Sequence, residues 1–424
     1  MFDGRLSLWA LRFSFFVSSS TALFLVVFAG IGISLRAPAV TRTEVLLAGF
    51  MPSESIPSAR VLPAAASPVT TGAKPALTEM PPSAPSGAPL IATAIVPELT
   101  GAPMIAASIV GQGARFARQF DASVFQRGNI HAHSNESDGD ADPRAVYLWY
   151  RSHGYQFAAV TDHNVFVDPE RFRDLESKDF VLLGGEEVTM RAAGKPVHIN
   201  ALCSSQRVLG GTFDNAERAL SVGVERVVAA GGIPLINHPN FYWGIDQPAL
   251  LAVRGVSLLE IYSGHPSVAG EGDEHHPSHE AMWDALLSSG QDYMGVAVDD
   301  AHHLHPNSDA QSQPGRAWIE AFAPTLERSL LCKAIMEGML YASNGAKLER
   351  IAVSESAYDV WPAAADTSVE FVGEGGHVLA TSHTKIAGER VTYRPEGRES
   401  YVRVRVMDNE GKRAWTPPVR VLSQ

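Results

Sequence analysis

Cysteine is scarce in this chain, which has only Cys203 and Cys332 among its 424 residues. Neither lies in a Cys-x-x-Cys pair, which argues against a zinc site built from thiolates. The two could form a disulfide in an oxidising compartment. Two buried free thiols are the interpretation that we favour, because free cysteine is commonly buried. The chain also lacks a Gly-x-Ser-x-Gly motif, so this signature of a serine nucleophile is missing.

Positive charge is also in short supply. There are 34 Lys and Arg residues against 46 Asp and Glu residues, and the formal net charge is -12. This balance argues against a nucleic-acid backbone as the main partner. It does not exclude an anionic substrate, because bound divalent ions would supply positive charge where the chemistry occurs. The hydrophobic fraction of 45% is typical of a globular protein, and the length allows two folded domains plus further segments.

Charged residues are absent from Phe13 to Leu35, a run of 23 residues. A run of this length can span a bilayer and exceeds the apolar region of an ordinary signal peptide. We therefore expect residues 1–36 to form a signal anchor or transmembrane segment, with a buried soluble helix as the alternative. The following Ala37-Pro-Ala39 resembles a cleavage site, so removal stays open. The folded part is expected to lie outside the cytoplasm, in the periplasm, either membrane-anchored or secreted.

Residues 37–110 are rich in Pro, Ala and Ser, and 11 of the 27 prolines lie between Pro52 and Pro103. A segment of this composition has little apolar surface to bury. We predict a disordered linker that tethers the folded part of the chain.

Strand and helix patterns alternate from about residue 125. Asp142-Pro143 predicts the start of a helix that ends near Gly154, and further helices are expected over Asn215–Ala230 and Ser278–Ser289. This order indicates an α/β domain over residues 111–345 with a parallel sheet, open or closed into a barrel. Buried strands are predicted at Arg127–Ile130, Tyr155–Thr161, Phe180–Leu183, Val197–Leu202, Ile233–Ile236, Val256–Ile261 and Met294–Val298.

The pattern changes again after residue 346. Tyr401–Val406 alternates strictly, and Trp415–Val421 reads as another strand after a turn. Further short strands are expected at Thr367–Val372, His377–Thr381 and Arg390–Tyr393. Residues 346–424 are therefore predicted to form a small, all-β, sandwich-like domain.

Candidate metal ligands follow the predicted strands of the α/β domain. His131 and His133 follow the first strand, His163 follows the second, and Asp300 and His302 follow the last. Active sites of parallel α/β folds gather at the carboxyl ends of strands. Imidazole combined with carboxylate suits zinc, iron or manganese. The chain is therefore expected to hold a multinuclear metal site with these candidate ligands: His131, His133, Asp138, His163, Glu187, His198, His238, Asp300 and His302.

These motifs, in this order, resemble the PHP (polymerase and histidinol phosphatase) family of metallohydrolases. The resemblance covers roughly residues 125–345 and is nearest to the exported, carbaryl-hydrolase-like members, which often carry a small carboxy-terminal β domain. It implies a distorted (β/α)7 barrel with a trinuclear metal centre. The motifs are Asn129-Ile-His131-Ala-His133-Ser134, Ser137-Asp138-Gly139, Thr161-Asp-His163-Asn164, Gly185-Glu-Glu187-Val188, Val197-His198-Ile199, Asn237-His238-Pro239 and Asp300-Ala-His302.

The resemblance also implies how the ligands are shared among two to three divalent ions (zinc, manganese or iron). One ion would take His131, His133, Glu187 and Asp300. A second would share Glu187 and take His198 and His238, and a third would take Asp138, His163 and His302. Glu187 is chosen over Glu186, and Asp300 over Asp299, from their places in the motifs. Supporting roles are the alternative for Glu186, Asp299 and Asp162.

A di- or trinuclear centre of this kind would lower the pKa of a bound water toward ~7 and supply hydroxide. The expected function is a metal-dependent hydrolase of a small-molecule ester, foremost a phosphoesterase (EC 3.1). The alternatives are a carbamate or carboxyl ester hydrolase on the same site and a non-catalytic, membrane-tethered binding protein.

Residues beyond the ligand set are assigned as follows. Glu187, His302 and His265 are the candidate catalytic residues, although His265 is also explained as a loop-shaping residue. Arg191 and Lys195 are candidates for holding a phosphate, with solvated loop charges as the alternative. Trp243 and Tyr262 are either pocket walls or core residues. The loop with His275, His276 and His279 is either a lid, an extra metal patch or a solvated loop, and we favour the solvated loop.

Overall fold

The computed structural model of this protein describes residues 114–423. The predicted membrane segment at Phe13–Leu35 and the predicted linker lie outside these residues. Among the residues that are described, no helix is both long enough and apolar enough to cross a membrane.

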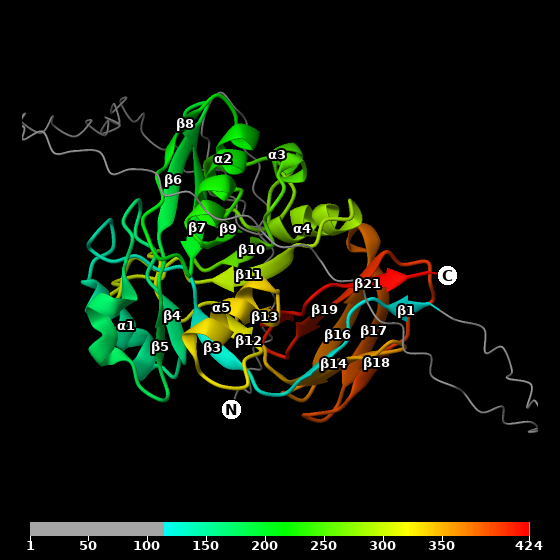
Figure 1. Cartoon of the computed structure of the whole chain (residues 1–424). Helices are drawn as coiled ribbons and strands as arrows, with labels where there is room; N and C mark the ends of the chain where they lie inside the picture. The colour runs from blue at the N-terminus through cyan, green and yellow to red at the C-terminus, as the bar shows by residue number, and fades with distance from the viewer. Residues whose placement is uncertain (1–113, 424) are drawn as a thin grey trace, which may run out of the picture. The chain divides into compact units, whose positions relative to one another are not determined.

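The described chain is a mixed α/β fold with several sheets and few helices (Figure 1). Asp142 caps α1 by accepting a hydrogen bond from the backbone N–H of Ala145, and Pro143 occupies the first turn, as predicted. Asn215 caps α2 and Ser278 caps α4 in the same way. The helices are α1 Pro143–Ser152, α2 Ala216–Ala229, α3 Gln247–Ala252, α4 His279–Ser288 and α5 Arg328–Met336.

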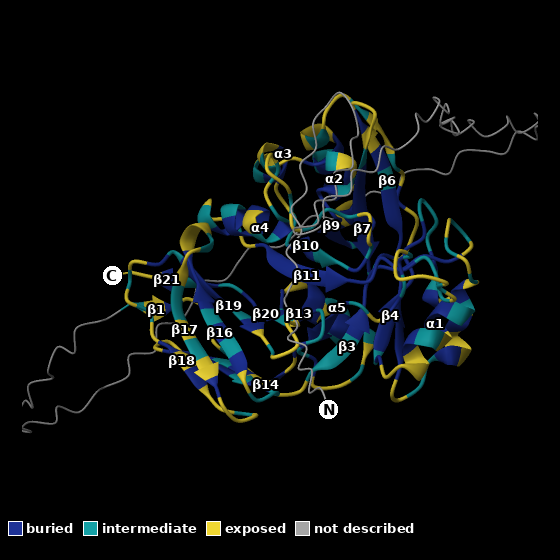
Figure 2. Cartoon of the chain, turned by 180° about the vertical axis from the view of Figure 1, so that it is seen from behind, coloured by how far each residue is buried: buried dark blue, intermediate teal, exposed yellow. Residues whose placement is uncertain are grey.

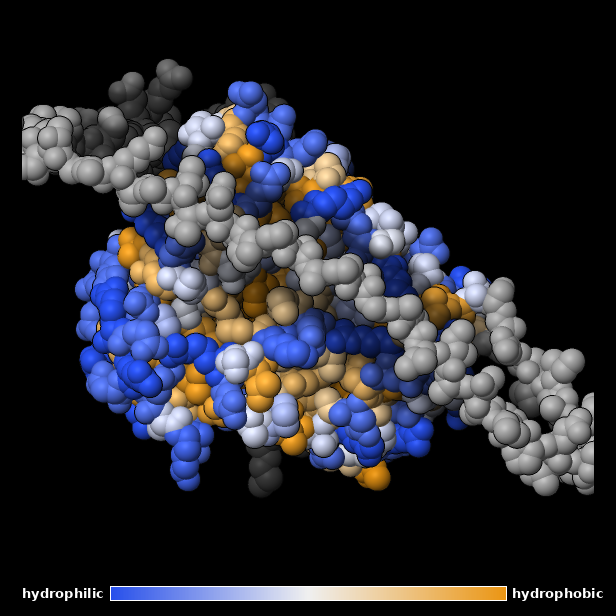
Figure 3. All heavy atoms as spheres, in the orientation of Figure 1, coloured by the Kyte–Doolittle hydropathy of each residue, from blue (hydrophilic) through white to orange (hydrophobic). Residues whose placement is uncertain are grey.

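Amphipathic helices cover the strands. In α1 the residues Val146, Tyr147 and Tyr150 are buried, whereas Arg151 and Ser152 face solvent. Hydrophilic residues accordingly dominate the side of the molecule that carries α1, at the left of Figure 3. The strands beneath the helices are mostly buried, as the dark ribbons of β7, β9 and β11 show in Figure 2.

One sheet holds the first strands of the α/β region. Strands β3 (Gln126–Asn129), β4 (Phe157–Ala159) and β5 (Val181–Leu183) are parallel neighbours. Next to β3 lies β12 (Trp318–Ala321), which runs antiparallel to it, and β13 (Leu340–Ser343) runs antiparallel to β12 on its other side. The strand patterns in the sequence therefore predicted β3 to β5 correctly, apart from their exact ends.

A second sheet has the strand order β11-β10-β9-β7-β6-β8. Its β7 runs antiparallel to both β6 and β9, so the prediction of a wholly parallel sheet was wrong at this strand. The reason is that β6 and β7 form a tight hairpin through Ala193-Gly194, both with positive φ, with no helix between them. The strands are β6 Glu187–Ala192, β7 Lys195–Leu202, β8 Gly211–Phe213, β9 Ile233–Ile236, β10 Leu258–Ser263 and β11 Met294–Val298.

The two sheets meet at two isolated bridges. Ala132 pairs with Ala301, and His163 pairs with Glu187, both in parallel orientation. These bridges lie just beyond the carboxyl ends of β3, β4 and β11 and at the start of β6. The two sheets are thus joined at the residues that carry the candidate ligands.

Some C-terminal strands continue the first sheet, and others form a third sheet. β20 pairs with β13, so the hydrogen-bonded ladder runs on into the C-terminal region. Strands β1 and β2, from residues 115–122, pair with β21 and β14. The division at residues 345/346 stays a prediction. The strands are β1 Arg115–Phe116, β2 Phe120–Ala122, β14 Leu348–Val353, β15 Tyr358–Pro362, β16 Thr367–Val372, β17 Val378–Thr384, β18 Val391–Tyr393, β19 Tyr401–Met407, β20 Arg413–Trp415 and β21 Val419–Leu422.

The single strand predicted over Trp415–Val421 is two strands. β20 ends at Trp415 and β21 begins at Val419, with Pro417 and Pro418 between them. Proline has no N–H to donate to a ladder, so two successive prolines interrupt the strand.

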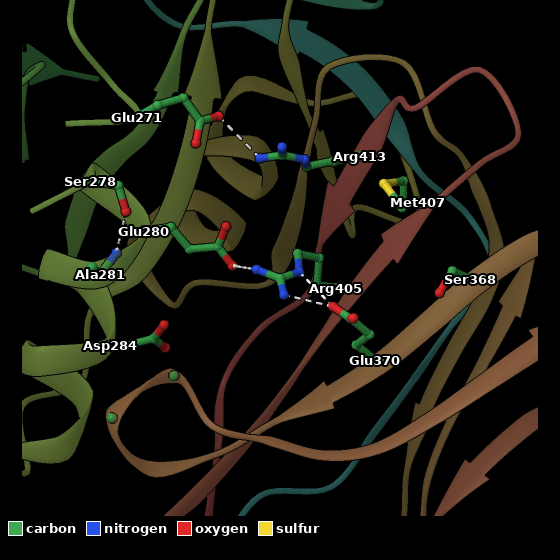
Figure 4. A pocket seen from close by; sticks show the side chains of 12 residues that line it. Glu271, Ser278, Glu280, Ala281, Asp284, Ser368, Glu370, Arg405, Met407 and Arg413 are labelled. Atoms are coloured by element: carbon green, nitrogen blue, oxygen red, sulfur yellow. Dashed lines mark hydrogen bonds and ion pairs between the residues drawn. The ribbon is translucent and has the colours of Figure 1, made fainter. Parts of the chain in front are cut away.

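Buried charges join β19 to α4. Arg403 is fully buried and forms a two-bond contact with Asp284, with distances of 2.8 and 2.7 Å. Beside it, Arg405 binds Glu280 and Glu370 around a cavity of about 450 Å³ (Figure 4). Because an uncompensated buried charge is strongly destabilising, each arginine needs its carboxylate. The C-terminal strands are therefore held on α4 by charge as well as by apolar packing.

Cys203 and Cys332 form a disulfide, with their Cα atoms 6.0 Å apart. The interpretation of two free thiols was therefore wrong. The bridge connects the residue after β7 to α5, 129 positions later in the chain, and no local pattern reports so distant a contact.

Candidate metal centre

All nine predicted ligands converge at the edge where the two sheets meet. His131 and His133 follow β3, His163 follows β4, and His238 follows β9. Glu187 is the first residue of β6, His198 lies within β7, and Asp300 and His302 follow β11. The nine form overlapping groups with ligand atoms within 4.8 Å of one another: His131, His133 and Glu187; His131, His238 and Asp300; His163, Glu187 and His198; and His133, Asp138, His163 and His302.

Glu187 lies at the middle of these groups. Its side chain is 1% exposed, and its two oxygens face different histidines. Oε1 lies 2.8 Å from Nδ1 of His198 and 3.3 Å from Nε2 of His238. Oε2 lies 3.0 to 3.3 Å from nitrogens of His163, His133 and His131. A carboxylate with this placement can bridge two cations.

Glu186 points elsewhere. Its Oε2 accepts a hydrogen bond of 2.7 Å from the backbone N–H of Val208, and burial raises its pKa. The structure therefore brings Glu187, and not Glu186, to the histidines, as the motif position predicted.

The side chains of Asp300 and Asp299 likewise point to different partners. Oδ1 of Asp300 lies 3.4 Å from Nε2 of His131 and 3.3 Å from Nε2 of His133. Asp299 instead accepts hydrogen bonds from Tyr150 and from the backbone N–H groups of residues 315–317. Asp299 thus fixes the loop after β11, which places its neighbour at the histidines.

The group around Asp138 is the exposed part of the cluster. Its side chain is 53% exposed, whereas the side chains of His131 and His133 are fully buried. Asp138 lies 3.4 to 3.6 Å from His133, His302 and His163, so His133 joins the three residues predicted for the third ion. The cluster therefore opens to solvent on the Asp138 side.

Glu260 belongs to the site but was not among the predicted residues. Its Oε1 lies 2.6 Å from Nδ1 of His131, and its Oε2 accepts a hydrogen bond from the backbone N–H of His238. A carboxylate behind a ligand histidine fixes the ring and directs its other nitrogen toward the metal. The signal in the sequence was an acid inside the apolar strand β10, where a buried charge needs a partner.

Further polar residues hold the ligand-bearing loops. Asp162 accepts hydrogen bonds from the backbone N–H of Ser134 (2.7 Å) and from Ser137 Oγ (2.6 Å), so the loop between His133 and Asp138 is tied to the end of β4. Asn237 donates to Oε1 of Glu187 at 2.8 Å. The Asp162 carboxylate thus supports the loop that carries ligands and, in these contacts, binds no ligand side chain itself.

The charge distribution of the cluster fits a cation. Burial alone would lower the pKa of His133, but Asp300 and Glu187 raise it to about 9. Oε2 of Glu187 and Nδ1 of His198 are buried and make no hydrogen bond within residues 114–423. The Nε2 atoms of His131 and His133 are 3.2 Å apart. This is close to the separation of about 3.4 Å expected for two nitrogens bound to one tetrahedral zinc. The donors present therefore suit divalent metal ions.

The other predicted site residues lie outside these groups. The His265 ring is next to His302, with ring centres 5.3 Å apart, and burial lowers the pKa of His265 to about 4. Arg191 and Lys195 lie at the far end of the β6–β7 hairpin and donate to the carbonyls of Gly194 and Trp243. Arg191 is four residues along the strand from Glu187, roughly 13 Å at the rise of a β-strand. The structure therefore brings neither the Arg191 side chain nor the Lys195 side chain to the cluster of candidate ligands.

The loop 271–279 is only partly the solvated loop that we favoured. His279 is fully buried, and its Nε2 accepts a hydrogen bond from the backbone N–H of Asn240. His276 stacks on Trp243 with ring centres 3.9 Å apart. Both contacts brace the segment that follows His238. Tyr262 packs against the core near Trp415 and also lines a cavity of about 770 Å³ that His265 shares.

No family model and no curated protein matches this chain. Solved structures are similar to it, among them three that are each 15% identical. One is a two-domain protein from Bacteroides vulgatus containing a predicted PHP-like metal-dependent phosphoesterase (73% of this chain, 96% of that chain, TM-score 0.39). Another is a candidate metal-dependent phosphoesterase from Bifidobacterium adolescentis (49% and 96%, TM-score 0.33). The third is an amidohydrolase from Chromobacterium violaceum with bound sulfate and no metal (50% and 96%, TM-score 0.34).

The description of the first structure contains the name of the family that the motifs resemble. The residues of the site and their geometry carry the proposal that follows.

Proposed function

We propose that this protein is a metal-dependent hydrolase of the PHP type that acts on phosphoesters. The observation that carries the proposal is the convergence of nine candidate ligand side chains, Glu187 among them, from separate elements of the two sheets. An assembly of buried histidines and carboxylates is costly unless a cation compensates the carboxylates. The proposal includes closure of the two sheets into a distorted (β/α)7 barrel, which the bridges Ala132–Ala301 and His163–Glu187 support.

The ligands divide into a buried part and an open part. His131, His133, Glu187, His198, His238 and Asp300 would hold two ions that share Glu187. Asp138, His163 and His302 would hold a third ion at the solvent side, with His133 near enough to contribute. Zinc, manganese and iron all accept this donor set.

Divalent ions bound here would lower the pKa of a coordinated water toward neutrality and polarise the phosphoryl oxygen of an ester. Within the chain, Glu187 would position the buried ions, and Glu260 would keep the lone pair of His131 directed at them. His302 lies at the open side, where it would hold the third ion or, with only two ions bound, donate a proton to the leaving oxygen. His265 is half-buried beside His302 and would shape the open side of the site.

The test is to measure metal content and activity on the same preparation. The full-length chain, purified in mild detergent, would be reconstituted with zinc, manganese or iron and assayed by elemental analysis. It would then be screened against phosphomonoesters, phosphodiesters, and carboxyl and carbamate esters. We expect two to three ions per chain and turnover of a phosphoester. Turnover of carboxyl or carbamate esters alone would replace phosphoesterase by ester hydrolase, and fewer than one ion per chain would refute the metal centre.

We also propose that the folded part works outside the cytoplasm, attached to the membrane through residues 1–36 or released after cleavage. The disulfide between Cys203 and Cys332 supports this location, because cytosolic thiols are kept reduced.

A further inference from the structure

The segment Phe241-Tyr242-Trp243 follows the ligand His238 and has an unusual backbone. Tyr242 and Trp243 both adopt positive φ, 49° and 55°. This left-handed region is unfavourable for bulky residues, and two in succession persist only where surrounding contacts hold them. The sequence around them therefore has to impose the conformation.

Contacts from three directions impose it. Lys195 Nζ donates to the carbonyl of Trp243 at 3.0 Å, and the Trp243 ring stacks on His276. Asn240 donates from its side chain to the carbonyls of Ala269 and Pro277, and its backbone N–H donates to the buried His279.

The next residue, Gly244, passes so close to the carbonyl oxygen of Pro196 that a Cβ would lie 2.0 Å from it. Only glycine fits there, so the segment is closed against the β6–β7 hairpin.

The braced backbone places the Phe241 ring at the metal centre and the Tyr242 ring beside it. The Phe241 ring packs on the ligand rings of His238 and His198, with ring centres 5.1 and 6.1 Å apart, and on His265 at 6.2 Å. The Tyr242 ring follows at 4.7 Å from Phe241, and Tyr242 is 71% exposed. A large ring held in a strained conformation and left exposed gains nothing from core packing.

We infer that Phe241 and Tyr242 form the specificity wall of this site and bind an aromatic group of the substrate. An anion held at the metal centre would have its organic substituent beside Phe241, with Tyr242 available to stack on it. Offset stacking between aromatic rings contributes beyond simple burial. The substrate class is therefore an ester with an aromatic group next to the anionic centre. This inference rests on the proposed function only in requiring that an anion binds at the metal centre.

The test uses two phosphonates, phenylphosphonate and methylphosphonate, because their carbon–phosphorus bond separates binding from hydrolysis. Their dissociation constants would be measured by calorimetry on the metal-loaded, full-length chain. We expect phenylphosphonate to bind roughly three- to tenfold more tightly, the range that one stacked ring supplies.

The variants Tyr242→Ala and Tyr242→Asn should lose this preference and keep the wild-type affinity for methylphosphonate. Asparagine tolerates positive φ, so the second variant removes the ring without added backbone strain. Tyr242→Phe should keep the preference, as should Ile386→Ala, which removes a residue of similar exposure (65%) in the turn between β17 and β18.

The inference is overturned if the wild type binds both phosphonates equally or neither, or if the preference survives in Tyr242→Ala and Tyr242→Asn. Failure of the proposed function is a separate result, because it would show as absent ester turnover while the binding preference remains.

Discussion

Nδ1 of His131 lies 2.6 Å from Oε1 of Glu260, so a buried carboxylate fixes the ring whose other nitrogen faces Glu187 and Asp300. The same Glu260 accepts from the backbone N–H of His238. One residue of β10 therefore orients two ligands that come from different strands.

We predict that Glu260→Gln weakens metal binding by about 10- to 100-fold, because a carboxylate behind a histidine ligand sets both its orientation and its basicity. Metal affinity would be measured by competition with a chelator of known strength. Glu320→Gln is the matched control, since Glu320 is a buried acid of β12 outside the ligand groups. Unchanged affinity in Glu260→Gln would show that His131 is oriented without it.

Glu187→Gln should abolish hydrolysis and remove most of the bound metal, because both carboxylate oxygens face ligand histidines. Glu186→Gln should retain metal and activity, since that side chain contacts the backbone of Val208. Elemental analysis and turnover would be compared for the two variants. Equal loss in both would contradict the assignment of Glu187 as the shared ligand.

Arg403→Ala should destabilise the protein by about 3–5 kcal/mol, because it leaves Asp284 buried without its partner. The free energy of unfolding would be measured by urea denaturation. Arg350→Ala is the control and should have a much smaller effect, since its pair with Asp121 is exposed to solvent. A small effect of Arg403→Ala would mean that water reaches Asp284.

The same network makes stability depend on pH. Burial alone would raise the pKa of Glu280, but Arg403 and Arg405 lower it below its ordinary value of 4.5. The folded state therefore binds this proton less readily than the unfolded state. The stabilisation from Glu280 is fully present above pH 4.5 and is lost as the pH falls through the lower, folded value. Glu280→Gln should lose less stability than the wild type between pH 5 and about pH 3.

Removal of the disulfide by Cys203→Ser with Cys332→Ser should lower the free energy of unfolding by about 2–5 kcal/mol, because the bridge restricts the unfolded chain. The wild type, isolated without reductant, should show no free thiol when denatured, and two after reduction. Two free thiols in the untreated protein would restore the interpretation that the structure contradicts.

An export reporter fused after residue 110 should be active, and a fluorescent reporter that matures only in the cytoplasm should be dark at that junction. The reason is the uncharged run Phe13–Leu35 together with the disulfide. The opposite pair of results would place the folded part inside the cell.

Much of the site was predictable from the sequence, because its ligands lie in short motifs and strands are readable from local apolar runs. His131-Ala-His133 follows a buried strand, and Asp300-Ala-His302 follows another. The carboxyl ends of parallel strands share one edge, so adjacency in space followed from order along the chain. The choice of Glu187 over Glu186 came from the motif, in which the ligand directly precedes Val188.

Only the tertiary structure decided the contacts between residues that lie far apart in the chain. Glu260 lies behind His131, Cys203 bonds Cys332, and Arg403 meets Asp284 across the packing of β19 on α4. None of these pairs leaves a local pattern, since each partner is selected by burial after the sheets and helices have packed. The sequence thus determined which side chains can bind metal. The packing of distant strands and helices decided which partner each buried charge and each thiol meets.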